Sequence, residues 1–251
     1  MPGSGLDKAD HSRNIHEDDL AGELFVTGEG DERAIEPADI QQGDVGDCYL
    51  LAMLAAVARA HPERIAQMVR ANGDGSFTVT LYPDGEPEQV EVDDVFWVNG
   101  HGMPAYAKYG DMRTTGARND ELWVMVIEAA WAKLHGGYDD ISGRDMDEGF
   151  IETLLQRKHT KVLTDDVTVE ELGRQLEEAF AAKIPVELAS RRELDSGPVR
   201  ENHAYALDGA ANGKFWLYNP LLSAKGRPEH LEGVDAALIK TYFEIVYFVP
   251  L

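Results

Sequence analysis

The sequence has little cysteine, few basic residues and no long apolar run. One Cys among 251 residues excludes an internal disulfide framework and any zinc site built on several cysteines. Lys and Arg total 23 against 46 Asp and Glu, a formal net charge of −23 that repels phosphate backbones and anionic lipid. We therefore expect no nucleic-acid partner and no membrane insertion.

Targeting signals are also missing. No apolar run reaches the roughly 18 residues that a membrane span needs, and the opening MPGSGLDKADHSRN lacks the apolar stretch of a signal peptide. These absences predict a cytoplasmic protein, or one secreted by a dedicated system that reads no signal peptide. What is present is an ordinary core composition, with 43% hydrophobic residues.

The pattern of apolar residues changes along the chain and predicts two lobes. Residues 1–22 are polar and predict a disordered tail, and residues 23–251 predict one folded region. Helical spacing dominates 23–158, whereas strand-like alternation dominates 159–251. The fold class is therefore predicted to be α+β, with a helical N-terminal lobe, a β-rich C-terminal lobe and the functional site in a cleft between them.

Local signals locate the main helices and hairpins. Helices are predicted over about 48–60, 119–134 and 168–180. Asn119 or Asp120 is the expected N-cap of the second helix and Gly136 its stop, and Thr168 caps the third. Alternating residues predict two hairpins, 76–82 with 89–98, and 204–208 with 214–218.

Cys48 follows a glycine-rich turn and opens the first predicted helix. The free N–H groups and the positive dipole end of a helix start favour a thiolate over a thiol. Gly43 and Gly46 leave room for a substrate chain to approach closely. The alternative interpretation is a buried structural cysteine packed against Leu50 and Leu51.

A thiolate nucleophile needs a base, and His203 has the best placed neighbour among the eight histidines. If the last hairpin pairs symmetrically, His203 lies directly opposite Asn219. An amide oxygen that accepts from one ring N–H fixes the tautomer and leaves the other nitrogen for a thiol. The alternatives are a core histidine and a strand-ending Asn219-Pro220 turn. The remaining histidines, His230 among them, show no partner in the sequence.

Four ordered motifs resemble those of the calpain family of cysteine peptidases. QGDVGDCYLL from Gln42 resembles the family's Q-G-x-x-G-D-C-[WY]-[LF]-L signature. Glu121-Leu-Trp followed by Glu128-AAWAKLHGGY is similar to E-[LF]-W…L-E-K-A-Y-A-K-x-x-G-x-Y. Asn202-His-Ala-Tyr and Tyr218-Asn-Pro are similar to G-H-A-Y and R-N-P-W. The Cys, His, Asn order and intervals also match papain-like chains. The resemblance is to a bacterial-type chain with the protease core only.

This resemblance implies a papain-like fold and a role for each matching residue. Cys48 is then the nucleophile, His203 the general base and acid, and Asn219 the residue that orients His203. Gln42 is expected to donate to the oxyanion together with the Cys48 backbone N–H. Asn202 stands where the family has Gly, and Leu221 where it has Trp, so weaker shielding of the His203–Asn219 pair from water is expected.

The resemblance also implies a calcium site. The family's protease core binds calcium through positions that hold Asp39 and Glu121 here. The alternative is that both carboxylates belong to a solvated acidic face. No cofactor is expected for the chemistry itself.

The leading functional prediction is a cysteine endopeptidase that cleaves protein or peptide substrates through a thiol acyl-enzyme. Two alternatives stay open, a transglutaminase-like acyl transferase and a non-catalytic binding module with the same fold. Basic peptides are expected to be favoured if acidic residues line the cleft. The sequence leaves substrate preference, autoprocessing and oligomeric state open.

Overall fold

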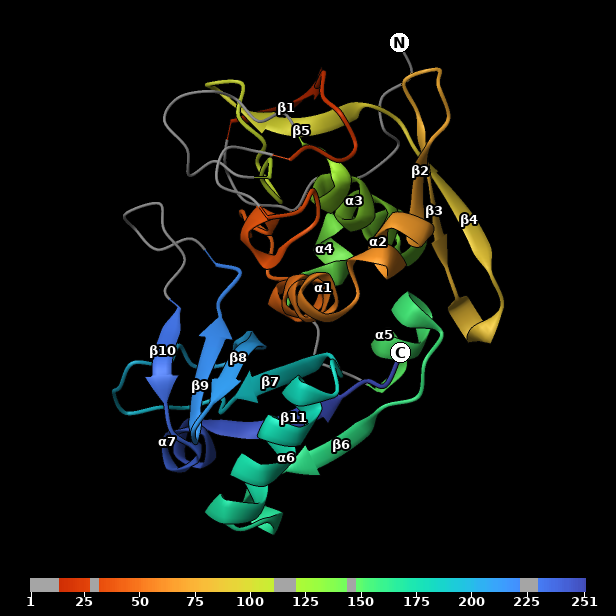
Figure 1. The fold of residues 1–251 in the computed structure, drawn as a ribbon. Coiled ribbons are helices and arrows are strands. Elements are labelled where there is room, and N and C mark those ends of the chain that lie inside the picture. Colours follow the sequence, from red (N-terminus) through yellow and green to blue (C-terminus); the bar gives the residue numbers. More distant parts are fainter. Residues whose placement is uncertain (1–13, 28–31, 111–120, 144–147, 222–229) are drawn as a thin grey trace. The chain divides into compact units, whose positions relative to one another are not determined.

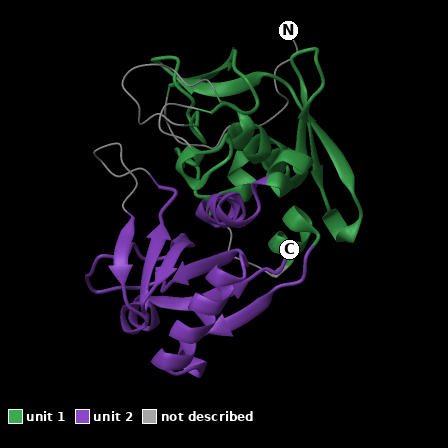
Figure 2. Ribbon diagram, in the orientation of Figure 1, with its two compact units in different colours: residues 1–47, 63–156 green, residues 48–62, 157–251 purple. Residues whose placement is uncertain are grey.

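The computed structural model describes residues 14–27, 32–110, 121–143, 148–221 and 230–251 (Figure 1). The chain divides into two compact units, each of which contains two separate stretches of sequence (Figure 2). Unit 1 comprises residues 1–47 and 63–156, and unit 2 comprises residues 48–62 and 157–251. Helices and strands occur in both units, so the predicted α+β class is confirmed.

Unit 1 is built around a largely buried helix and two small sheets. Its helices are α2 (Pro62–Met68, which starts at the unit boundary), α3 (Trp123–His135), α4 (Tyr138–Ile141) and α5 (Glu148–Leu155), with 3₁₀ turns η1 (Pro37–Asp39) and η2 (Pro83–Gly85). Its strands are β1 (Ile15–Asp19), β2 (Val69–Ala71), β3 (Phe77–Leu81), β4 (Glu88–Val92) and β5 (Val95–Asn99). Helix α3 packs against the antiparallel sheet β2-β3-β4, and its residues are buried from Trp123 through Ala132.

Two predictions are wrong in this unit. The predicted tail, 1–22, contains strand β1, which pairs antiparallel with β5. The predicted second strand of the first hairpin, 89–98, is divided at Asp93-Asp94: β4 pairs with β3, but β5 pairs with β1. The partner of β5 lies some eighty residues earlier in the chain, and local alternation carries no information about such a distant pairing.

Unit 2 is a six-stranded antiparallel sheet in the order β10-β9-β8-β7-β11-β6. The strands are β6 (Thr160–Leu163), β7 (Val186–Ser190), β8 (Ala204–Ala211), β9 (Lys214–Tyr218), β10 (Leu231–Val234) and β11 (Phe243–Phe248). The helices are α1 (Cys48–Ala60), α6 (Val169–Ala181) and α7 (Ala236–Tyr242), with a 3₁₀ turn η3 (Thr164–Asp166). Helices α6 and α7 contribute to one apolar core with alternate residues of the strands.

Helix α1 belongs to unit 2, although the sequence assigns it to the helical lobe. It packs against β7 and β8, and Figure 2 gives it the colour of the sheet. At its C-terminal end the Arg59 guanidinium lies 2.5 Å from a carboxylate oxygen of Asp208 on β8. The division of the chain therefore differs from the predicted lobes 23–158 and 159–251, because a helix can join a sheet whose strands follow it by more than a hundred residues.

The β8–β9 hairpin has a different register from the symmetric one predicted. Ala206 pairs with Tyr218 and Leu207 with Leu217, so the pairing is offset by two residues. Strand β8 extends to Ala211, a bulge interrupts the ladder after Leu207, and the turn is Asn212-Gly213, both at positive φ. An Asn-Gly pair at positive φ is typical of a tight type I′ hairpin turn. An offset of two residues keeps each side chain on its predicted face.

Helix boundaries agree well with their sequence signals. Helix α1 spans the predicted 48–60, and Gly136 ends α3 in the left-handed region with φ 102°. Thr168 caps α6, because its hydroxyl accepts from the Glu171 N–H at 3.1 Å. Asn119 and Asp120, the expected caps of α3, lie outside the described residues. Among the helices that the structure describes, none is long and apolar enough to cross a membrane.

Candidate active site

Cys48 is the first residue of α1 and is partly exposed. The segment before it is held by backbone hydrogen bonds within unit 1. The Asp44 N–H donates to the Ala105 carbonyl at 3.0 Å, and the Gly143 N–H donates to the Gly46 carbonyl at 2.8 Å. A side chain at Gly43 would place its Cβ 1.9 Å from the Tyr106 carbonyl oxygen. Only glycine fits there, so its role in this turn is close packing.

His203 and Asn219 form the contact that the sequence predicts. The His203 Nε2 lies 2.7 Å from the Asn219 Oδ1, although the two residues are diagonal rather than directly opposite in the observed register. The Leu221 N–H also donates to Asn219 Oδ1, at 2.9 Å, which fixes the orientation of the amide. The amide oxygen can only accept, so the ring proton of neutral His203 is on Nε2 and Nδ1 is left as a base.

Burial keeps the His203 imidazole neutral. Its side chain is 6% exposed, and burial, with a smaller effect from the positive charge of Arg200, lowers the pKa of His203 to about 4. The hydrogen bond to Asn219 opposes this shift because it favours the protonated ring. A neutral imidazole with a free Nδ1 lone pair is the form in which histidine accepts a proton.

Three contacts hold the His203 backbone and ring in place. The Ser190 hydroxyl accepts from the His203 N–H at 2.9 Å and donates to the Arg200 carbonyl at 2.7 Å. The Ser190 N–H donates to the His203 carbonyl at 2.8 Å. The Tyr205 ring meets the imidazole edge to face, with centroids 5.2 Å apart. Sequence reasoning missed Ser190 and Tyr205, because the end of β7 meets the start of β8 only in the folded sheet.

The two departures from the family motif do not expose the pair. Asn202 adopts φ 46°, a left-handed conformation that asparagine tolerates better than most residues, so it can stand in for glycine. Leu221 supplies a backbone N–H to Asn219. His203 and Asn219 are only 6% and 3% exposed, so the expectation of weaker shielding from water is wrong.

His230 is a further neighbour that the sequence did not indicate. Its Nδ1 lies 3.4 Å from the Asn219 backbone nitrogen, which donates to it, and its ring lies against Tyr218 with centroids 4.5 Å apart. His230 therefore borders the residue that orients His203. No sequence signal marks this contact.

Gln42 is buried in unit 1, and its amide nitrogen is engaged. The Gln42 Nε2 donates to the Val45 carbonyl at 2.8 Å and to Asp47 Oδ1 at 3.3 Å. The residue is 4% exposed, and its Oε1 has no hydrogen-bond partner among the described residues. The amide nitrogen of Gln42 thus faces two acceptors of the turn before Cys48, of which the Val45 carbonyl is the closer.

Asp47 and Glu128 form a buried acid pair that sequence reasoning missed. They are 0% and 1% exposed, and their carboxyl groups are in hydrogen-bond contact. Burial raises the pKa of Asp47 to about 7. Burial, and then the charge of Asp47, raise the pKa of Glu128 well above its ordinary value. The motif contains both residues, but nothing in the sequence shows that two acids are buried together.

Asp39 and Glu121 are both buried in unit 1, at 1% exposure each, so the alternative of a solvated acidic face is wrong. Asp39 Oδ2 accepts from the Glu36 N–H at 2.7 Å, and Glu121 Oε1 accepts from the Val26 N–H at 2.8 Å. Carboxylate oxygens suit calcium, which takes six to eight oxygen ligands. Within the described ranges no group of three or more His, Cys, Asp or Glu is arranged around a metal position, so other oxygens would have to complete a site.

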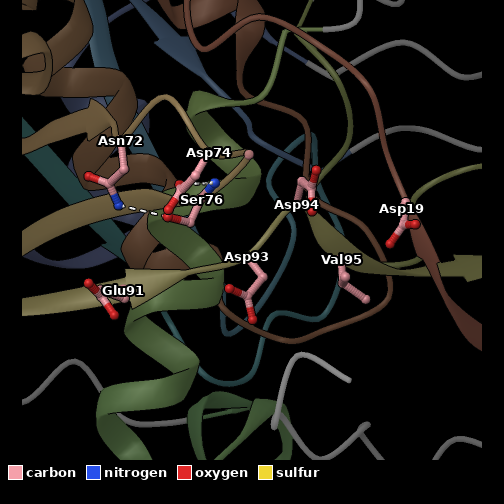
Figure 3. A pocket seen from close by; sticks show the side chains of 9 residues that line it. Asp19, Asn72, Asp74, Ser76, Glu91, Asp93, Asp94 and Val95 are labelled. Atoms are coloured by element: carbon pink, nitrogen blue, oxygen red, sulfur yellow. Dashed lines mark hydrogen bonds between the residues drawn. The ribbon is translucent and has the colours of Figure 1, made fainter. Parts of the chain in front are cut away.

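A separate acidic pocket of about 550 Å³ lies in unit 1 (Figure 3). Its carboxylates come from β1, the β2–β3 turn and the end of β4 with the link to β5: Asp19, Asp74, Glu91, Asp93 and Asp94. Hydrogen bonds from the hydroxyl and the N–H of Ser76 lower the pKa of Asp74. The pocket concentrates negative charge on one part of unit 1.

Comparison with known proteins assigns this arrangement to a family. Residues 25–222 match the model of the calpain family cysteine protease. The calpain-type cysteine protease DEK1 of Zea mays is 29% identical over 188 residues, which cover 69% of this chain and 8% of that protein. The calpain-2 catalytic subunit of Bos taurus is 34% identical over 134 residues, covering 50% of this chain and 17% of that protein.

These matches cover half of this chain or more but only a small part of either relative. The matched range contains Cys48, His203 and Asn219 together with Gln42. The mixed helix and sheet architecture is that of a papain-like protease core. The chain belongs to the calpain family of cysteine proteases.

Proposed function

We propose that the chain is a cysteine endopeptidase in which Cys48, His203 and Asn219 act on protein or peptide substrates. The hydrogen bond of 2.7 Å between His203 Nε2 and Asn219 Oδ1 is the observation that carries the proposal. It leaves Nδ1 of a neutral imidazole as the base, in the same unit as the helix that begins at Cys48. Family membership supports the same chemistry.

In the proposed reaction, Nδ1 of His203 takes the proton of the Cys48 thiol, and Sγ attacks the carbonyl carbon of the substrate. The carbonyl electron pair moves to the oxygen, and the Cys48 N–H and a Gln42 N–H stabilise this oxyanion. When the C–N bond breaks, His203 returns the proton to the leaving amine and a thioester forms. Water, deprotonated by His203, then attacks the thioester, the C–S bond breaks, and Sγ regains its proton. No cofactor takes part in these steps.

The test is cleavage of fluorogenic peptides by the wild type and by Cys48→Ala, together with active-site labelling by an epoxide probe. We expect Cys48→Ala to lower kcat/KM by about 10³-fold or more and to abolish labelling. Cleavage that survives the substitution would rule out Cys48 as nucleophile. Transfer of the acyl group to added amines in preference to water would indicate an acyl transferase, and an unreactive Cys48 at neutral pH would indicate a binding module.

A further inference from the structure

Asp47 of the Asp47–Glu128 pair directly precedes the proposed nucleophile and contacts Gln42, yet the proposed mechanism gives the pair no role. Asp47 ends the turn that leads into α1, and Glu128 lies in the middle of α3. Both residues belong to unit 1, and both are buried. Two buried acids in contact cost free energy unless a proton lies between them, so the protonation state of the pair is constrained.

The contacts of the two carboxyl groups, together with the direction of their mutual pKa shifts, indicate where that proton lies. The Ala107 N–H is 3.0 Å from both carboxyl oxygens of Glu128, and Asp47 Oδ1 accepts from Gln42 Nε2. No N–H or hydroxyl group of the described residues donates to Asp47 Oδ2, which is buried. A carboxyl proton between the two groups satisfies this oxygen, and it stays on Glu128 because the hydrogen bond between them raises the pKa of Glu128 and lowers that of Asp47. Glu128 is then a neutral acid and Asp47 a carboxylate.

Other titratable groups around the pair do not change this assignment. Tyr138 on α4 is buried, and burial raises the pKa of its hydroxyl, so it stays neutral. Tyr106 stacks on Tyr138 with ring centroids 3.9 Å apart. The Lys108 ammonium, which donates to the Pro104 and Ala105 carbonyls, favours a negative charge on the pair. One negative charge and one shared proton are therefore compatible with Tyr138, Tyr106 and Lys108.

An anionic Asp47 also fixes which end of the Gln42 amide faces the turn. Two acceptors, the Val45 carbonyl and Asp47 Oδ1, face the amide nitrogen. A rotated amide would direct Oε1 at both acceptors, which is repulsive while Asp47 is ionised. A protonated Asp47 could instead donate to Oε1, which has no partner among the described residues. The orientation of Gln42 thus depends on the charge of Asp47.

We propose that Glu128 is a positioning residue of the peptidase: as a neutral acid it donates to Asp47, keeps Asp47 ionised and so holds the amide nitrogen of Gln42 in the orientation that an oxyanion donor needs. This inference rests on the proposed function for its catalytic consequence. The link from Glu128 through Asp47 to Gln42 is a property of unit 1 and can be measured without catalysis.

The first measurement follows the Gln42 side-chain NH₂ signal by NMR from pH 5 to pH 9, with Gln42→Leu to assign it. We expect the signal to titrate in the wild type with the ionisation of the acid pair and to become independent of pH in Asp47→Asn. A signal that does not move with pH in the wild type would overturn the proposal, whether or not the protein cleaves peptides.

The second measurement compares peptide hydrolysis with alkylation of Cys48 by iodoacetamide, a displacement that forms no oxyanion. Glu128→Met removes the donor to Asp47, so we expect kcat/KM at pH 7 to fall about tenfold or more and its acid limb to move to higher pH. The alkylation rate should change by no more than about twofold. Glu128→Gln, whose amide can donate to Asp47 and accept from Ala107, should recover most of the loss.

Glu187→Met is the matched control, because it removes a buried carboxyl group of unit 2 by the same substitution. It should change neither hydrolysis nor its pH profile. Equal activities of Glu128→Met and Glu128→Gln, or a parallel loss of hydrolysis and alkylation, would mean that Glu128 is only structural. A wild type in which Gln42 titrates and Cys48 is alkylated, but no peptide is cleaved, would contradict the proposed function and leave the Glu128 link standing.

Discussion

Unit 1 and unit 2 bury their titratable groups in different ways. In unit 1, Asp47 and Glu128 contact each other and receive hydrogen bonds from Gln42 and Ala107. In unit 2, Glu187 is 0% exposed, and among the described residues no donor reaches either of its carboxyl oxygens. Burial alone raises the pKa of Glu187 well above its ordinary value. Unit 1 can therefore hold a buried negative charge, whereas unit 2 holds its buried acid in neutral form.

The same contrast applies to the proposed chemistry. His203 in unit 2 is kept neutral by burial and faces a neutral amide, and its pKa is lowered to about 4. A carboxylate in place of Asn219 would favour imidazolium instead. Unit 2 thus holds the proposed base in the form that accepts a proton, and unit 1 holds a charge close in sequence to the proposed nucleophile. The comparison predicts that peptide hydrolysis depends on an uncharged partner of His203 in unit 2 and on the negative charge of Asp47 in unit 1.

Among the substitutions that test this contrast between the units, removing the neutral partner of His203 should have the largest effect. In Asn219→Ala the Nε2–H loses its acceptor and the tautomer is no longer fixed, so we expect kcat/KM for peptides to fall about 10- to 100-fold. The loss should lie mainly in kcat, because Asn219 orients the base and does not bind substrate.

Two further variants make this measurement specific. Asn219→Asp keeps an acceptor but adds a charge, and we expect it to raise the pKa of His203, measured by NMR of the imidazole. Asn212→Gly, in the β8–β9 turn, is the asparagine control and should retain full activity, because glycine also adopts the positive φ found there. Activity of Asn219→Ala within about twofold of the wild type would show that the His203–Asn219 bond has no catalytic role.

Glu187 offers the second largest effect, on stability. It alternates with Val186 and Leu188, which pack in the core with α6 and α7, so its side chain lies on the face of the sheet that α1 covers. A carboxyl group whose pKa is raised by folding stabilises the fold fully below its unfolded pKa, near 4.5, and this contribution is lost as the pH rises toward the folded value. Glu187→Met removes the ionisable group and with it this loss of stability at high pH. We expect the substitution to raise the free energy of unfolding by about 1–3 kcal/mol at pH 8.

Urea denaturation at pH 5 and at pH 8 measures this difference. The gain from Glu187→Met should be larger at pH 8, because the unfolded wild type is ionised there while the folded state retains its proton. Glu193→Met, at an exposed loop position, is the control and should change the free energy of unfolding by less than about 0.5 kcal/mol. An equal gain at the two pH values would show that folding does not raise the pKa of Glu187.

Elements with local signals could be predicted from the sequence, and pairings between distant segments could not. The start of α6 follows from the Thr168 cap and the end of α3 from Gly136, signals that are contained within one turn. The predicted register of β8 with β9 is wrong by two residues, because the symmetric pairing takes no account of the Asn212-Gly213 turn and the bulge. His203 and Asn219 still meet, because an even offset keeps both side chains on one face.

The candidate site could be proposed from the sequence where residue order and the family motifs carry the chemistry, and the catalytic roles stay predictions. Cys48, His203 and Asn219 stand out because a thiol, an imidazole and an amide in that order serve one reaction. Glu128 and Glu187 do not stand out, since a carboxyl group in a chain with 46 acidic residues gives no sign that it is buried. Burial depends on which segments meet, and that is decided by the tertiary fold.

Calcium binding at Asp39 and Glu121 is the smallest expected effect and sharpens the comparison within unit 1. In this unit a shared proton can stabilise the contact between Asp47 and Glu128. Asp39 and Glu121 each accept a hydrogen bond from a backbone N–H, and their carboxylate oxygens are the ligand type that a divalent cation such as calcium prefers. At a calcium concentration ten times Kd, we expect a stabilisation of about 1.4 kcal/mol, seen as a higher Tm than with chelator.

Asp39→Asn and Glu121→Gln should each reduce this increase in Tm, because each removes a charged ligand. Asp93→Asn, in the acidic pocket of Figure 3, is the matched control and should leave the increase unchanged. If Asp93→Asn abolishes the effect while Asp39→Asn retains it, the cation binds at the pocket and the prediction for Asp39 is wrong. A Tm that is the same in chelator and in millimolar calcium would exclude both sites. The buried acids of unit 1 would then be stabilised by the proton that Asp47 and Glu128 share and by hydrogen bonds, without a metal ion.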